Sequence, residues 1–105
     1  MKKVPADTPP KFQGGDVNSF AQWVAQHLRY PAVAREIGVQ GKVTVQFTVG
    51  TDGYLRDVTV LRSVEASLDK EAVRVVSSSP QWTPGVKNGR TVTETYTMPV
   101  VFQLH

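Results

Sequence analysis

Apolar and polar side chains alternate almost without interruption from residue 91 to residue 104. Apart from Glu94, one parity is apolar: Val92, Tyr96, Met98, Val100, Phe102 and Leu104. A period of two over this length predicts a β-strand with one buried and one solvent-exposed face. Pro99 lies inside the pattern and cannot donate a ladder hydrogen bond, so we expect this strand at the edge of a sheet. We expect Glu94 at the fraying end of the sheet or paired with a basic side chain, because a lone buried carboxylate is unfavourable.

The same alternation predicts two earlier strands. Residues 43–49 alternate valine and phenylalanine with threonine and glutamine, and residues 54–62 place Val58 and Val60 on one face. The Asp52-Gly53 pair between them is a strong hairpin signal.

A helical period predicts three helices in the rest of the chain. Residues 17–28 follow an amphipathic stripe after the N-cap Asp16, and Pro31 prevents the helix from continuing. A short helix over residues 32–37 ends at Gly38, a residue that readily adopts the left-handed conformation. The third helix is predicted to begin at an N-cap Ser67 and to end before a proline. Its buried stripe is Leu68, Ala72, Val75 and Val76.

This order of elements predicts an α+β fold. The two earlier strands form a hairpin, and the last strand returns after a helical crossover beside the first strand. The expected architecture is a three-stranded antiparallel sheet of order 2-1-3 with the helices packed on one face. The last strand then has one flank without a neighbour.

Backbone direction identifies the groups on that free flank. Alternate residues of an antiparallel strand direct their N–H and C=O groups to opposite sides. If Pro99 avoids an internal ladder bond, the outward set is Thr93, Thr95, Thr97, Pro99, Val101 and Gln103. An ordinary edge covered by threonines fits this pattern, and so does an edge that accepts a partner's extended segment by β-augmentation.

Composition narrows the class of protein. The chain has 105 residues, is 40% hydrophobic and contains no cysteine, as expected for one ordinary domain without disulfides or thiolate metal sites. Its formal charge of +3 comes from scattered basic residues, whereas nucleic-acid binding usually needs a denser basic stripe. No segment is apolar enough to span a membrane, and no signal peptide is visible. Residues 1–13 are interpreted as the remnant of a Pro-rich linker, which suggests an upstream portion, and residues 14–105 as the domain.

The sequence offers no catalytic or metal-binding constellation. No carboxylate, histidine and hydroxyl set has catalytic spacing, and His-rich metal patterns are absent. We therefore expect no enzymatic activity, no cofactor and no metal. Trp82 is interpreted as a core residue rather than a carbohydrate platform.

From Phe12 to Leu104 the chain resembles the C-terminal domain family of TonB. The similarity lies in Tyr30-Pro31, in the runs GVQGKVTVQFTVGTDGYL and SLDKEAVRVVSSSPQWTPG, and in YTMPVVFQL. The resemblance implies a periplasmic domain whose full-length parent is anchored in the inner membrane and works with motor proteins there. It also implies that the TonB box of an outer-membrane transporter adds as a strand beside the last strand. The resemblance further implicates Gln26, His27, Arg29 and Tyr30 in docking, although a histidine on a helix surface is more often simply solvated.

Other functions fit the same plan of elements. A cystatin-like protease inhibitor shares the helix on an antiparallel sheet, but the turn at residues 51–54 lacks a convincing apolar wedge. TonB-like domains are also appended to other membrane proteins. Two exposed edges can pair into a homodimer. A hydrolase is least favoured, because no site for it is visible.

Overall fold

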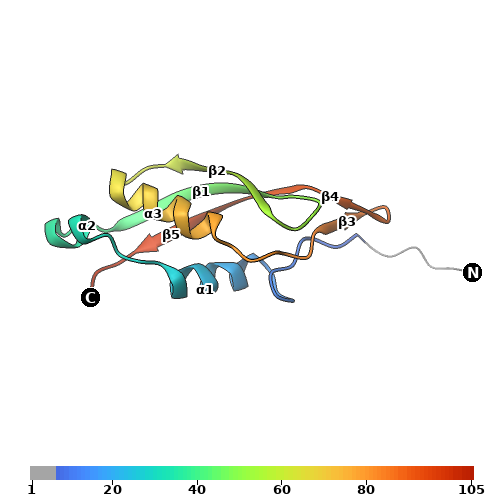
Figure 1. The fold of residues 1–105 in the computed structure, drawn as a ribbon, viewed down its shortest axis with the longest axis horizontal. Helices are drawn as coiled ribbons and strands as arrows, with labels where there is room; N and C mark the ends of the chain where they lie inside the picture. Colours follow the sequence, from blue (N-terminus) through green and yellow to red (C-terminus); the bar gives the residue numbers. More distant parts are fainter. Residues whose placement is uncertain (1–6) are drawn as a thin grey trace, which may run out of the picture.

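A computed structural model describes residues 7–105 of the chain (Figure 1). It contains three helices and five strands in the described part. They are α1 (Val17–His27), α2 (Ala32–Ile37), β1 (Gly41–Val49), β2 (Leu55–Arg62), α3 (Ala66–Ser77), β3 (Gly85–Lys87), β4 (Arg90–Val92) and β5 (Glu94–Phe102).

The predicted α+β architecture is confirmed. Strands β2, β1 and β5 form a three-stranded antiparallel sheet in that order. Burial alternates along β1 and β5, because every second side chain faces the helical layer. Helices α1 and α3 lie alongside the sheet (Figure 1), α1 against β5 and α3 against β1 and β2.

Two of the predicted helix caps are observed, and one is corrected. The Asp16 carboxylate accepts hydrogen bonds from backbone N–H groups at the start of α1, and Gly38 ends α2 with a φ of 73°. The prediction that Ser67 caps α3 is wrong. The carboxylate of Glu65 accepts from the N–H groups of Ser67 and Leu68, so the helix begins at Ala66.

The last predicted strand is interrupted. The alternating segment 91–104 forms β4 and β5 with a break at Thr93. Strand β4 pairs with the short β3 across a turn in which Asn88 and Gly89 both have positive φ, 53° and 78°. That turn chemistry was visible in the sequence, but three residues of β3 are too few to show a period.

The described part of the predicted linker packs on the domain. Thr8 and Val86 exchange two backbone hydrogen bonds of 2.9 Å, and Lys11 and Thr83 do the same. The segment therefore runs beside β3. Residues 1–6 of the predicted linker lie outside the described residues.

An aromatic cluster joins this segment to the core. The ring of Phe12, only 1% exposed, lies 5.1 Å from Phe20 and 5.4 Å from Trp82 between centroids. Trp82 is 2% exposed, and its indole N–H donates to Ser79 Oγ at 2.9 Å. The interpretation of Trp82 as a core residue is confirmed.

Candidate functional site

The free flank of β5 is the longest regular backbone edge of the sheet. Strand β5 pairs with β1 through an unbroken register from Glu94 opposite Val49 to Phe102 opposite Gly41. Among residues 7–105, no strand lies on its other side. Pro99 stands opposite Thr44. Because proline has no N–H, this position fits a non-hydrogen-bonded pair, in which the backbone groups of both residues point away from each other. The odd-numbered residues of β5 then direct their N–H and C=O groups outward.

Side-chain burial holds this strand in place. The six residues of the predicted outward set are all exposed: Thr93, Thr95, Thr97, Pro99, Val101 and Gln103. The intervening side chains of Met98, Val100 and Phe102 are at most 5% exposed. The core therefore fixes the register of β5 through its inner side chains and leaves the edge uncovered within residues 7–105.

The opposite edge of the sheet is irregular. The pairing of β2 with β1 shifts register twice, once beside Leu61 and once beside Asp57, and Asp57 has a φ of 52°. These shifts are β-bulges, which twist an edge and disturb its ladder groups. An incoming strand would meet a regular hydrogen-bonding edge on β5 and a distorted one on β2.

The four predicted docking residues lie at the end of α1 and just beyond it. Gln26, His27 and Arg29 are exposed, and Tyr30 is partly buried. The imidazole of His27 stacks on Trp23 with centroids 4.2 Å apart, and its Nδ1 lies 2.8 Å from the Trp23 carbonyl oxygen. The ring of Tyr30 meets Phe102 of β5 edge-on at 5.7 Å, so this segment adjoins the far end of the strand.

A buried carboxylate that the sequence analysis did not single out fixes this segment. Glu71 Oε2 accepts from the backbone N–H of Arg29 at 2.7 Å, and its two oxygens accept from Arg74 Nε and Nη2 at 2.6 and 2.7 Å. Arg74 also donates to the His27 carbonyl at 3.3 Å. In the sequence, the only sign of the buried Glu71 is that a charged residue stands between Leu68 and Val75 on the buried stripe of α3.

The hydrogen bonds that Glu71 accepts keep its carboxyl group ionised. Burial alone raises the pKa of this carboxyl, but the hydrogen bonds from Arg74 and from the Arg29 amide outweigh burial and leave the pKa below its ordinary value. Glu71 is therefore an anion at neutral pH and ties α3 to the connection between α1 and α2.

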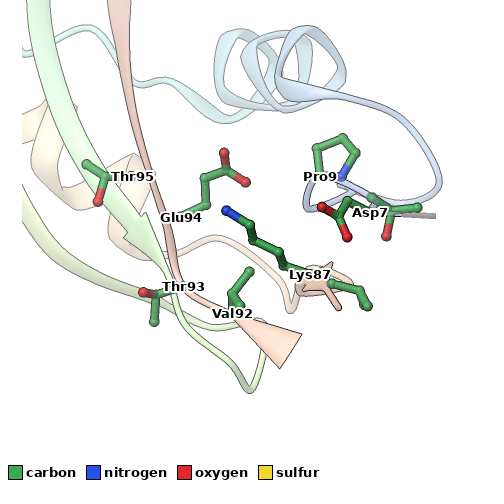
Figure 2. Close-up of a pocket in the computed structure, with 9 residues that line it drawn as sticks. Asp7, Pro9, Lys87, Val92, Thr93, Glu94 and Thr95 are labelled. Carbon is green, nitrogen blue, oxygen red and sulfur yellow. The ribbon is translucent and has the colours of Figure 1, made fainter. Parts of the chain in front are cut away.

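Pockets lie near both ends of the β5 edge. An open pocket of about 590 Å³ borders its first residues and includes Asp7, Lys87 and Glu94. There the Lys87 side chain points toward Glu94 (Figure 2). The exposed Glu94 is the first residue of β5, so its expected place at the end of the sheet is confirmed. A second pocket, of about 410 Å³, adjoins Val101 and Gln103 at the other end.

Within residues 7–105, no group of three or more acidic, histidine or cysteine side chains is placed to hold a metal ion. No helix in that part of the chain has the length and apolar character needed to cross a bilayer.

Comparisons with known proteins identify relatives of this domain. A family model described as the Gram-negative bacterial TonB protein C-terminal matches residues 26–104. Protein TonB of Pseudomonas aeruginosa is 32% identical over 75 residues, which cover 71% of this chain and 22% of that protein. Protein TonB of Haemophilus influenzae is 42% identical over 57 residues, which cover 53% of this chain and 21% of that protein. The chain thus spans about a fifth of the length of these relatives.

Solved structures share the fold. One solution NMR structure of the Helicobacter pylori TonB C-terminal domain superposes with a TM-score of 0.64 at 22% identity, covering 83% of this chain and 91% of that one. A longer version of the same domain superposes with a TM-score of 0.63 at 23% identity, covering 90% of this chain and 89% of that one. These similarities show a common fold. The family match over residues 26–104 and the 32% identity to Protein TonB of Pseudomonas aeruginosa show that the chain belongs to the TonB C-terminal domain family.

Proposed function

We propose that this domain is the partner-binding end of a periplasmic energy-transducing protein, and that the outer flank of β5 receives an extended TonB-box segment of an outer-membrane transporter. The incoming backbone pairs with the outward groups of Thr93, Thr95, Thr97, Pro99, Val101 and Gln103. In this proposal the parent protein is anchored in the inner membrane and receives energy from motor proteins there.

The observation that carries the proposal is the difference between the two edges of the sheet. Strand β5 offers a continuous register and uncovered backbone groups, whereas β2 carries two bulges. Proteins usually protect a long regular edge against aggregation. An unprotected edge beside a protected one is therefore expected where strand addition is the function.

The energetics favour a transient complex. About five new backbone hydrogen bonds, each worth roughly 0.5–1.5 kcal/mol net, contribute a few kcal/mol. Ordering a flexible segment costs about 1–2 kcal/mol per residue. Side-chain contacts near the edge must therefore supply much of the affinity, and in this proposal the predicted docking residues Gln26, His27, Arg29 and Tyr30 contribute to it.

Other binding modes predict different contacts. A cystatin-like inhibitor would insert the turn at residues 51–54, where Tyr54 is the exposed large apolar side chain. A domain appended to a different membrane protein would use the same β5 edge for another partner. A homodimer through β5 would occupy the same flank and compete with an added peptide.

Backbone amide shifts in a peptide titration test the proposal. A TonB-box peptide added to labelled protein should shift the amides of residues 93–103. No shift there at millimolar peptide, or shifts confined to residues 51–54, would refute strand addition at β5.

A pair of variants at one position isolates the backbone contribution. Thr95→Pro removes the outward N–H and should abolish binding while the fold is kept, as Pro99 is already accommodated in the same strand. Thr95→Val is the matched control, because both variants lose the 3.0 Å contact between the Thr95 and Thr48 hydroxyls but only proline removes the amide. Equal binding by the two variants would show that this N–H is not used.

A further inference from the structure

The pocket beside Val101 and Gln103, at the C-terminal end of β5, brings together the free backbone edge of the strand, an apolar wall and the positive charge of an arginine. Its volume is about 410 Å³, and it is lined by Ala25, Leu28, Tyr30, Arg35, Val101, Gln103 and His105. Val101 and Gln103 belong to the proposed binding edge. A strand added to β5 would therefore bring its own side chains into this pocket.

The charge in the pocket is held by an aromatic ring. The Arg35 guanidinium lies 5.4 Å from the centre of the Tyr30 ring, in a cation–π contact. Tyr30 is itself fixed, since its hydroxyl donates to the Val39 carbonyl and its ring packs against Phe102. Arg35 is thus oriented without a carboxylate.

The cation keeps its capacity to bind an anion. The ion pairs found within residues 7–105 join Arg56 to Asp52 and Arg74 to Glu71, and neither involves Arg35. A guanidinium is suited to a carboxylate, because its planar N–H groups match two carboxylate oxygens. The wall formed by Ala25 and Leu28 is suited to an aliphatic side chain.

The charged side chains also differ between the two ends of the β5 edge: carboxylates border the end at Glu94, whereas Arg35 borders the end at Val101. Glu94 and Asp7 border the opposite pocket, together with Lys87. Residues 94 and 102 are about 26 Å apart along a strand rising roughly 3.3 Å per residue. That separation exceeds the Debye length of about 8 Å at physiological ionic strength, so each end of the edge acts on its own part of the ligand.

We propose that Arg35 selects an acidic residue in the transporter segment, placed beside an aliphatic residue that fills the pocket next to Val101. The contact fixes which end of the segment lies at residues 101–103. This inference rests on the proposed strand addition and specifies the chemistry of the partner.

Two peptides that differ in one residue test the selection. Both are Val/Thr-rich extended peptides of TonB-box length, one carrying glutamate at one end and the other glutamine. Dissociation constants are measured by amide shifts in the 105-residue chain. The glutamate peptide should bind about three- to tenfold more tightly, as expected for one charge-assisted contact at a partly open site.

Variants of the protein assign the effect to Arg35. Arg35→Gln should remove the preference, Arg35→Lys should keep part of it because the charge remains, and the preference should shrink at high salt. Arg62→Gln, an exposed arginine on β2, is the matched control and should keep it. Equal affinities with shifts still at residues 93–103 would overturn the role of Arg35 and leave strand addition intact. No shifts on β5 with either peptide would overturn strand addition itself.

Discussion

Replacing Glu71 tests how firmly the connection between α1 and α2, which carries two of the predicted docking residues, Arg29 and Tyr30, is attached to the rest of the domain. In Glu71→Gln the side chain keeps its size and one carbonyl oxygen but loses its charge. It can no longer accept two charge-assisted bonds from Arg74 while also accepting the Arg29 amide. The variant should unfold more easily and loosen the connection at residues 28–31.

The magnitude follows from the contacts. Hydrogen bonds to charged groups are worth about 1.5–3 kcal/mol each, and breaking a fully buried pair costs about 3–5 kcal/mol. The side chain of Glu71 is 10% exposed, but that of Arg74 is 44% exposed and regains water when released. We therefore expect a loss of about 2–4 kcal/mol in the free energy of unfolding, or roughly 8–20 °C in Tm for a domain of this size.

The pH dependence has a definite sign. The pKa of Glu71 is lowered in the folded state, so its stabilising effect is complete above the unfolded value of about 4.3 and is lost as the pH falls through the folded value. The stability difference between wild type and Glu71→Gln should be constant from pH 7 to about 5. It should narrow below about pH 4.

Denaturant and thermal unfolding of wild type and Glu71→Gln at several pH values measure both effects. Glu36→Gln, which removes an exposed carboxylate from α2, is the control and should change stability by less than about 0.5 kcal/mol. A loss for Glu71→Gln no larger than for Glu36→Gln, or a difference that does not depend on pH, would refute the role assigned to this carboxylate.

Two further substitutions test the core and a close backbone approach. Phe12→Ala should lower the free energy of unfolding by about 3–5 kcal/mol, since it empties a site among aromatic rings, whereas Val33→Ala, at a position 60% exposed, should change it little. If both variants melt alike, the segment before α1 is not part of the core. Gly53→Ala should be more destabilising than Gly89→Ala. Both glycines have positive φ, but a Cβ on Gly53 would lie 1.9 Å from the Trp82 carbonyl oxygen, whereas one on Gly89 meets nothing within 4 Å; equal losses in chemical denaturation would contradict this.

Long periodic segments were predictable from the sequence. Strands β1 and β5 each alternate over nine residues, and α1 places Phe20 and Val24 on one buried face. In such segments the hydrophobic period repeats several times, so an exception at a single residue does not obscure it. The helical crossover that places the last strand beside β1 leaves β5 as an edge, so the predicted outward set followed from Pro99 and this topology.

Features that depend on single residues were not predictable in the same way. The proline-rich composition of residues 1–13 indicated a linker, and the burial of Phe12 in the core was not predicted. Ser67 is a preferred N-cap residue type and Glu65 is not, so residue type alone favoured the wrong position. The observed cap at Glu65 depends on where the chain leaves β2. Glu71 lies on a stripe interpreted as apolar, and its partner Arg29 is far away in sequence, so their contact appears only in three dimensions.

In the proposed strand addition, the affinity depends on how firmly β5 is already held in place. The side chains of Met98, Val100 and Phe102 are buried against the helical layer, so the receiving backbone is already in the conformation that pairing requires. The entropy lost on binding then falls mainly on the incoming segment. Because backbone bonds alone barely offset that loss, discrimination between partners must come from fixed side chains next to the edge. Arg35, held over the Tyr30 ring beside Val101, has both the position and the charge to provide it.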